Sequence, residues 1–187
     1  MVIPGMMSGD SSTAYLRRSL EASGFDVRKS GITFQTGIEA TRFGSLQARV
    51  LNIREATGKK PLLVGWSLGG LYARALAHAA AKDVAMIMSL GSPFSGPRTA
   101  NRAWRLYNLV NDHSVDSPPI AIDVSCKPPV FTIAAWSRRD GIVSVASAQG
   151  LPEESDETLE LPGSHFDLGT SSRCVRPVIE RLGRVPE

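Results

Sequence analysis

A short apolar segment, followed at once by a tight turn and a helix, constrains the fold of this chain more than any other feature. Residues 61–66 (Pro-Leu-Leu-Val-Gly-Trp) have the character of a buried strand, and residues 68–82 have that of a helix. A second apolar segment, residues 84–90, follows and has the length of another strand. Strand, helix and strand in this order are typical of a parallel sheet.

The same alternation extends along the chain. We expect further strands at residues 2–3, 25–28, 130–136 and 157–161, and helices at residues 11–23, 38–57, 99–110 and 173–182. The sequence therefore predicts an α/β fold, with a doubly wound, mostly parallel sheet of about six strands and helices on both faces. At 187 residues we expect one domain over residues 1–187, in which residues 95–129 lack strand character and form a short cap or lid.

Composition excludes several classes of protein. The chain is 42% hydrophobic and 21% charged, which is the balance of a globular protein rather than a disordered one. The net charge is only +3 and the basic residues are scattered, so we expect no nucleic-acid partner. No apolar stretch approaches the roughly 18 residues of a membrane helix, so we expect no integral membrane segment. Two cysteines, Cys126 and Cys174, argue against a disulfide scaffold; their pairing stays open, as does the oligomeric state.

The amino terminus carries no visible secretory signal, because Met1-Val2-Ile3-Pro4-Gly5 already resembles the end of a buried strand. The cytoplasm is the default expectation. A mature secreted form would look the same, so the compartment stays open.

One motif carries chemistry. Gly65-Trp66-Ser67-Leu68-Gly69 matches the Gly-x-Ser-x-Gly pattern of a nucleophile elbow, and it lies between the clearest strand and the clearest helix. Such a turn holds its serine in a strained backbone conformation at the carboxyl end of the sheet, and its glycines are needed because a Cβ would collide with the neighbouring elements. A serine hydroxyl at this point requires a base, held in turn by an acid, to act as a nucleophile.

Three histidines are candidates for the base. His78 lies about three turns into the helix after Ser67 and cannot fold back to it. His113 lies in a polar loop, whereas His165 follows the last strand and should emerge at the same sheet edge as Ser67. We therefore predict that His165 is the base.

Three aspartates are candidates for the acid. Asp140 follows the strand at residues 130–136, and Gly141 allows a turn that aims the carboxylate inward. Asp167 is two residues from His165 and should face away, and Asp123 precedes its strand and should lie at the opposite end of the sheet. The chain order Ser67, Asp140, His165 is also that of a known serine-hydrolase arrangement.

Five segments together match the motifs of a known enzyme family: Ile3-Pro4-Gly5-Met6, Gly65-Trp66-Ser67-Leu68-Gly69-Gly70, Gly91-Ser92-Pro93-Phe94, Asp140-Gly141-Ile142-Val143 and Gly163-Ser164-His165-Phe166. With them the chain resembles the α/β-hydrolases of the lipase/esterase type over nearly its whole length. The resemblance implies an oxyanion hole built from the backbone N–H groups of Met6 and Leu68. Pro4 stands where the family usually has histidine. The chain is also short for the family, as if the first two strands were missing.

The resemblance implies a thinly covered site whose apolar lining would bind the acyl part of a substrate. We name six candidates for this lining, each of which ordinary core packing would also explain: Met7, Phe94, Trp104, Tyr107, Val143 and Phe166. The chemistry implied is hydrolysis of a small-molecule or lipid ester through an acyl-enzyme on Ser67, with no metal or organic cofactor. An acyltransferase or thioesterase with the same triad is the alternative, and a non-catalytic binding protein on this fold is a third.

Overall fold

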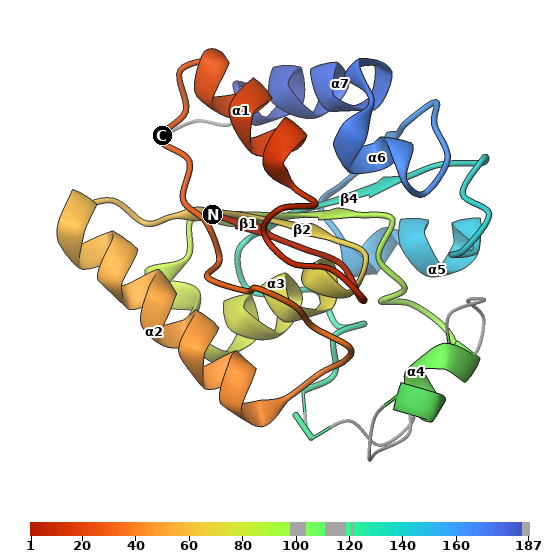
Figure 1. Ribbon diagram of the computed structural model, residues 1–187, viewed down its shortest axis with the longest axis horizontal. Helices are drawn as coiled ribbons and strands as arrows, with labels where there is room; N and C mark the ends of the chain where they lie inside the picture. The colour runs from red at the N-terminus through yellow and green to blue at the C-terminus, as the bar shows by residue number, and fades with distance from the viewer. Residues whose placement is uncertain (98–103, 111–118, 121, 185–187) are drawn as a thin grey trace.

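A computed structural model gives the structure of residues 1–187 (Figure 1), and it describes all of them except 98–103, 111–118, 121 and 185–187. The described strands are β1 (Val2–Ile3), β2 (Leu62–Trp66), β3 (Met86–Leu90), β4 (Phe131–Trp136) and β5 (Glu157–Glu160). The described helices are α1 (Ala14–Ala22), α2 (Ala40–Thr57), α3 (Leu68–Ala79), α4 (Trp104–Val110), α5 (Val145–Gln149), α6 (Asp167–Thr170) and α7 (Ser172–Leu182), with short 3-10 turns at Ala81–Asp83 and Pro152–Glu154.

The strands form one parallel sheet in the order β1-β2-β3-β4-β5. Val64 of β2 lies opposite Met88 of β3, which in turn lies opposite Ile133 of β4. Because the strands are parallel, their carboxyl ends meet at one edge of the sheet. Segments that follow β1, β2, β3, β4 and β5 therefore converge on that edge.

The described sheet has five strands rather than about six. The expected strand at residues 25–28 does not form; instead Lys29 makes a single parallel bridge to Val2, and the Val2 N–H donates to the Arg28 carbonyl at 3.2 Å. The reason is that β1 is only two residues long, so it offers a sixth strand almost nothing to pair with.

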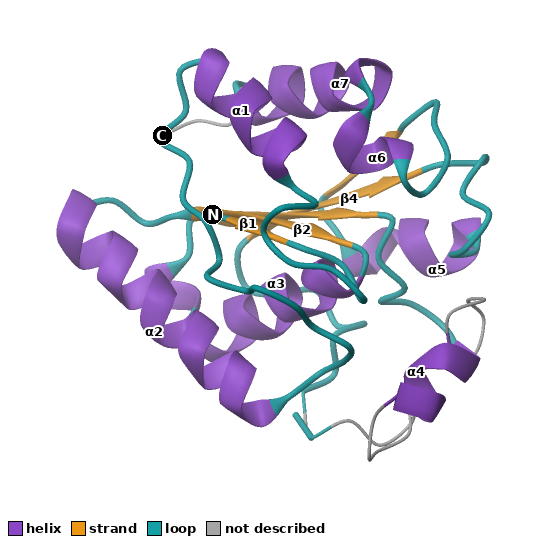
Figure 2. Cartoon of the chain, in the orientation of Figure 1, coloured by secondary structure: helices purple, strands orange, loops and turns teal. Residues whose placement is uncertain are grey.

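Helices cover both faces of the sheet, as expected for a doubly wound fold. Figure 2 shows α1, α6 and α7 on one side of the strands and α2 and α3 on the other. Along β3, Ile87 packs toward α2 and α3, whereas Met86 and Met88 pack toward α1 and α7. Alternate residues of a strand point to opposite faces, and both faces are apolar because both are buried.

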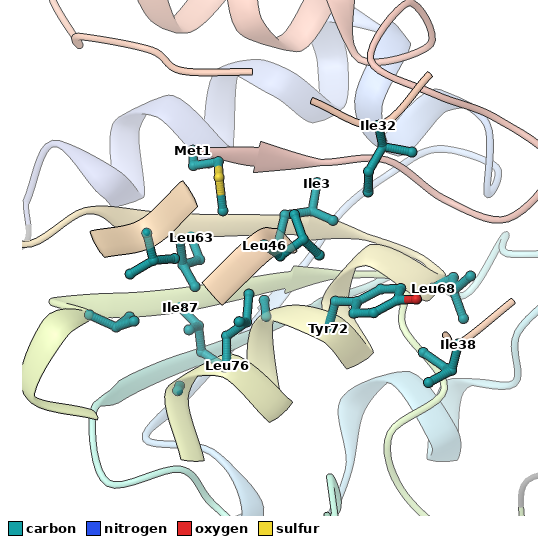
Figure 3. Close-up of a cluster of buried hydrophobic side chains, with 14 of the residues drawn as sticks. Met1, Ile3, Ile32, Ile38, Leu46, Leu63, Leu68, Tyr72, Leu76 and Ile87 are labelled. Atoms are coloured by element: carbon teal, nitrogen blue, oxygen red, sulfur yellow. The ribbon is translucent and has the colours of Figure 1, made fainter. Parts of the chain in front are cut away.

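The core beneath α2 and α3 is shown in Figure 3. Ile3, Leu63 and Ile87 project from three neighbouring strands, and Leu46 of α2 and Leu76 of α3 close over them. This packing fixes α3, and with it Ser67 directly before the helix, at the carboxyl edge of the sheet.

The expected helix at residues 99–110 is α4, which the structure describes from Trp104; residues 99–103 lie outside the described residues. Three short elements were not expected from the sequence: α5, α6 and the turn at Pro152–Glu154. Each has five residues or fewer, which is too short to show helical periodicity. Among the described helices, none is both long enough and apolar enough to cross a membrane.

Candidate functional site

Ser67 lies at the junction of β2 and α3, with φ of 54° and ψ of −119°. This positive-φ backbone conformation costs a non-glycine residue free energy. Its N–H donates to the Leu90 carbonyl at 2.8 Å, which ties the junction to the end of β3. The flanking glycines explain how so tight a turn fits. A Cβ on Gly65 would lie 2.3 Å from the Gly69 carbonyl oxygen, and one on Gly69 would lie 2.3 Å from the Ile3 oxygen.

Asp140 and His165 form a buried pair. His165 Nδ1 lies 2.6 Å from Asp140 Oδ2, and the two side chains are 7% and 1% exposed. The second carboxylate oxygen, Oδ1, accepts the N–H groups of Ile142 at 2.9 Å and Val143 at 2.8 Å. Since Oδ1 is occupied by its own turn, Oδ2 is left for the imidazole. An imidazole that donates from Nδ1 keeps Nε2 as a proton acceptor.

Backbone contacts bring Ser67 and the Asp140–His165 pair to the same edge. Leu90, which accepts the Ser67 N–H, is followed by Gly91 with φ of 57°. A Cβ on Gly91 would lie 2.9 Å from Asp140 Oδ2 and 3.3 Å from His165 Nδ1. On the other side of the junction, Trp66 Nε1 donates to the His165 carbonyl at 3.1 Å. Contacts of Gly91 and Trp66, which neighbour Ser67 in the fold, therefore place Ser67 and the Asp140–His165 pair at the same sheet edge.

The competing acids and bases lie elsewhere. His78, in the last turn of α3, contacts the Cys126 carbonyl at 3.0 Å. Asp167 accepts the Ser164 N–H at 2.8 Å and its hydroxyl at 2.7 Å. These hydrogen bonds lower the pKa of Asp167 below its ordinary value. Asp123 is engaged by the Ser125 N–H and hydroxyl, at 3.0 and 2.6 Å, and His113 lies outside the described residues.

The segment after β1 lies against Ser67. A Cβ on Gly5 would lie 3.3 Å from Ser67 Cβ and 3.9 Å from Ser67 Oγ. The N–H groups of Met6 and Leu68 find no hydrogen-bond acceptor among the described residues. Free N–H groups near a serine hydroxyl, one of them at a helix N-terminus, can stabilise a negatively charged oxygen by donating hydrogen bonds to it.

A cavity of about 290 Å³ lies next to α3, and none of the described residues that line it is Ser67, Asp140 or His165. The lining begins one helical turn after Ser67, at Leu71, and includes Ile38, Phe94, Tyr107 and Ile120. The cavity therefore lies close to Ser67 along α3, but none of the three candidate residues is part of its lining.

Of the six predicted lining residues, only Phe94 and Tyr107 border this cavity. Val143 is buried with Trp136 and Ala148 in a separate apolar cluster. Phe166 is 66% exposed and packs its ring edge-on to His165, with centroids 6.1 Å apart. The two others are not among its lining residues: Met7 is 45% exposed, and Trp104 is half-buried at the start of α4.

A family model described as the alpha/beta hydrolase fold matches residues 12–109, just over half of the chain. The chain belongs to the α/β-hydrolase fold family. The match includes Ser67 but ends before Asp140 and His165, so it does not bear on those two residues. No curated protein matches the sequence.

Solved structures extend the similarity over nearly the whole of this α/β hydrolase. Against the monoacylglycerol lipase of Paleococcus ferrophilus the TM-score is 0.66 at 17% identity, covering 97% of this chain and 92% of that one. The esterase domain of a Rhodothermus marinus protein gives 0.61 at 18% identity, with 97% and 83% covered. The thioesterase domain from the curacin biosynthetic pathway gives 0.63 at 12% identity, with 97% and 88% covered. At these identities the likeness establishes the fold alone.

Two buried polar side chains near the candidate site, those of Arg74 and Gln35, were not expected from the sequence. Arg74 is fully buried in α3 of this α/β hydrolase, with its guanidinium 3.9 Å from the Phe94 ring centre. It donates to the carbonyls of Val124, Ser125, Cys126 and Glu154, and burial lowers its pKa to about 10. An arginine among the alanines and leucines of an apolar helix was the available signal. Gln35, which is 1% exposed and donates to the Pro4 and Gly5 carbonyls, had no such signal.

Two points about single residues remain. Gly141 was expected to allow the turn at Asp140; it has no positive φ, and nothing lies within 4 Å of a Cβ built on it, so the turn does not depend on glycine there. The carboxylate is aimed instead by the N–H groups of Ile142 and Val143. Cys126 and Cys174 are both free thiols. In the described part of the chain, no three His, Cys, Asp or Glu side chains gather as metal ligands would.

Proposed function

We propose that this α/β hydrolase cleaves carboxylic esters through an acyl-enzyme on Ser67. The observation that carries the proposal is the buried Asp140–His165 pair, with 2.6 Å between carboxylate oxygen and ring nitrogen, at the sheet edge where Ser67 has a strained, positive-φ backbone. A strained backbone and a buried ionisable pair each cost free energy, and both features cluster at functional sites.

In the proposed reaction, Ser67 Oγ attacks the ester carbonyl carbon while His165 Nε2 takes the hydroxyl proton. Asp140 holds the imidazole in the tautomer with Nδ1–H and stabilises its charged form. The C–O bond to the leaving alcohol then breaks, and His165 returns its proton to that oxygen. Water attacks the acyl-enzyme in the same way, releasing the acid and restoring the Ser67 hydroxyl.

The N–H groups of Met6 and Leu68 supply the oxyanion hole in this proposal. Both are free of acceptors among the described residues, and Gly5 leaves room beside Ser67. Negative charge develops on the substrate oxygen only as the tetrahedral intermediate forms, so fixed donors stabilise that state over the ground state. One such donor is typically worth about 3 kcal/mol.

We propose that the cavity beside α3 binds the apolar part of the substrate, and that the region at residues 95–129 acts as its cap through α4. Phe94 and Tyr107 form part of its wall, and Tyr107 Oη accepts the Ile38 N–H at 3.1 Å, which joins α4 to the segment before α2. An apolar pocket with a few polar groups is typical of small-molecule sites. The exposed Met7 and Phe166 are the remaining candidates for contact with an apolar substrate at the surface.

A thioesterase is the second candidate, because the curacin thioesterase domain shares this fold at a TM-score of 0.63. The proposed triad would serve equally for a thioester or for transfer of the acyl group to an alcohol. The chemistry differs only in the leaving group or in the acceptor that replaces water.

The first test is hydrolysis of p-nitrophenyl esters of increasing acyl length, with Ser67→Ala as the variant. Ser45→Ala is the matched control, because its exposed hydroxyl on α2 only donates to the Thr41 carbonyl. We expect turnover by the wild type and the control, and none above background by Ser67→Ala. Thioesters of the same acyl groups, and added alcohols as acceptors, then separate esterase from thioesterase and transferase.

If the wild type hydrolyses none of these esters, labelling with a fluorophosphonate tests whether Ser67 is a reactive nucleophile. Labelling confined to Ser67 would support a working nucleophile with another substrate. Absence of both turnover and labelling would contradict the proposal and favour a binding protein.

A further inference from the structure

The side chain of Gln35 is buried between two segments that border the candidate site. These segments are the amino-terminal loop (residues 4–10) and the facing segment (residues 30–38). Gln35 is 1% exposed, and its Nε2 donates to the carbonyls of Pro4 at 2.6 Å and Gly5 at 3.0 Å. The opposite amide orientation would set Oε1 against two carbonyl oxygens and is excluded by repulsion.

The Gly5 carbonyl belongs to the same peptide group as the Met6 N–H. Because a peptide is planar and trans, its oxygen and its hydrogen point in opposite directions. Any group that fixes the Gly5 oxygen therefore also fixes the direction of the Met6 N–H. That oxygen accepts two side chains, Gln35 Nε2 at 3.0 Å and Ser8 Oγ at 2.8 Å. The N–H on the other side has no acceptor among the described residues.

Without these contacts, the peptide would have considerable freedom. Proline fixes its own φ, but Gly5 carries no Cβ and can turn its peptide through a wide range of angles. Hydrogen bonds to the carbonyl also polarise the peptide and strengthen its N–H as a donor.

The backbone of residue 35 reinforces the same link. The Met7 N–H donates to the Gln35 carbonyl at 2.7 Å, and the Gln35 N–H donates to the Ser8 carbonyl at 3.0 Å. Gln35 therefore forms hydrogen bonds with the loop both before Met6, through its side chain, and after Met6, through its backbone. Farther along, the Asp10 carboxylate accepts the N–H groups of Ser30 at 3.1 Å and Gly31 at 2.8 Å.

We infer that Gln35 is a positioning residue for the oxyanion hole: it holds the Gly5–Met6 peptide so that the Met6 N–H faces the reacting carbonyl, with Ser8 in a supporting role. The inference rests on the proposed ester hydrolysis. Gln35 does not touch the substrate; it acts through the backbone. It supplies a restraint where Pro4 replaces the histidine usual in the family.

The test compares Gln35→Met, which keeps the length of the side chain and removes its donor, with Gln47→Met on α2 as the control. Steady-state kinetics on the best p-nitrophenyl ester should show kcat lower by about 10- to 100-fold in Gln35→Met, because the hole acts on the transition state. KM should change by about twofold or less, and the pH profile of kcat/KM should keep its shape because Asp140 and His165 are untouched. Gln47→Met should match the wild type.

A thionoester of the same acid adds a readout that mere loss of structure would not move. Sulfur is a weak hydrogen-bond acceptor, so a C=S substrate gains little from the N–H donors. Gln35→Met should therefore slow the ester more than the thionoester, whereas general damage would slow both equally. Ser8→Ala removes the other side-chain donor to the Gly5 carbonyl, from a half-buried residue, and should lower kcat several-fold. This variant provides the test if Gln35→Met does not fold.

Unchanged kcat in a folded Gln35→Met or Ser8→Ala protein would overturn the inference while leaving ester hydrolysis standing. An equal loss on both substrates, or a loss confined to KM, would also overturn it. If the wild type hydrolyses no ester, the rate of fluorophosphonate labelling replaces kcat, because the phosphoryl oxygen occupies the same hole. A wild type that is neither active nor labelled would refute the proposed function, and the inference with it.

Discussion

The two sides of the candidate site are built in different ways. The carboxyl-terminal arm (residues 137–143 and 163–167) presents side chains, and short turns orient its two carboxylates. Asp140 accepts N–H groups two and three residues ahead, and Ser164 donates to an aspartate three residues ahead. The amino-terminal arm (residues 4–10 and 30–38) presents backbone N–H groups. Besides the local Ser8–Gly5 hydrogen bond, side-chain contacts between its two segments join residues 20 to 31 positions apart.

The difference explains what each arm depends on. A side chain in a local turn is oriented by its neighbours in sequence, so the direction of the Asp140 carboxylate is set locally. His165 in addition contacts Asp140 and Trp66, which are distant in sequence. A backbone N–H has the same chemistry in every residue, so its direction must be set by whatever restrains the peptide from outside. The amino-terminal arm therefore depends on a buried amide from a distant segment.

The largest expected effect comes from removing the charge at the centre of the carboxyl-terminal arm. In Asp140→Asn, the side-chain oxygen should keep the Ile142 and Val143 N–H groups, which turns the amide NH₂ toward His165 Nδ1. That donor favours the imidazole tautomer with its proton on Nε2, which cannot act as a base. We expect kcat/KM to fall by about 10³- to 10⁴-fold in ester kinetics.

Asp167→Asn is the control for that variant, since its carboxylate contacts Ser164 rather than His165. It should stay within about threefold of wild-type kcat/KM. Losses of similar size in the two variants would mean that the acid has been assigned wrongly.

The next effect tests the packing of the amino-terminal arm. A Cβ on Gly9 would lie 1.9 Å from the Thr33 carbonyl oxygen and 2.8 Å from that of Ile32, so the backbone of the facing segment must move. We expect Gly9→Ala to lower the free energy of unfolding by about 1–3 kcal/mol, and kcat with it. Urea denaturation measures the first and ester kinetics the second.

Gly44→Ala, within α2, is the matched control because nothing lies within 4 Å of its Cβ. It should gain about 0.5–1 kcal/mol from the higher helix propensity of alanine. A Gly9→Ala protein as stable as the wild type would show that the two segments are not tightly joined.

A smaller effect compares two glycines near the carboxyl-terminal arm. Gly91 has φ of 57°, and its Cβ would lie 2.9 Å from Asp140 Oδ2, whereas Gly141 has open space. We expect Gly91→Ala to cost about 1–2 kcal/mol from the left-handed backbone alone, and to disturb the Asp140–His165 contact. Its pH profile of kcat/KM should shift, whereas that of Gly141→Ala should not. Equal profiles would argue against a tight fit around the pair.

The smallest effect concerns Asp167 and the stability of the His165 loop. Hydrogen bonds from Ser164 lower the pKa of Asp167 from its ordinary value of 3.8, so the folded state favours the charged form. The stabilisation is fully present above that ordinary value and is lost as pH falls through the lower pKa of the folded state. Urea midpoints should place Asp167→Asn slightly below the wild type at pH 7, and the gap should close in acid. A gap that is constant with pH would contradict this account.

Comparison of sequence and structure shows which features could be predicted. The junction at Ser67 was predictable because a strand, a glycine-bounded serine and a helix follow one another directly, and the expected β2 and α3 formed within three residues of their predicted ends. The proximity of Asp140 and His165 was expected because parallel strands deliver the residues after their carboxyl ends to one edge. The expected strand at residues 25–28 was wrong, because strand formation there depended on the length of its neighbour.

The sequence by itself determined the parallel α/β architecture, the junction at Ser67 and the order of its candidate partners, because these follow from periodicity and from contacts within a few residues. Only the tertiary structure decided that Gln35 meets the Pro4 and Gly5 carbonyls and that Arg74 lies beneath Phe94. Both side chains donate mainly to backbone carbonyls, which every residue carries. No pattern of residue types can reveal such partners, since only the folded chain brings them within hydrogen-bond distance.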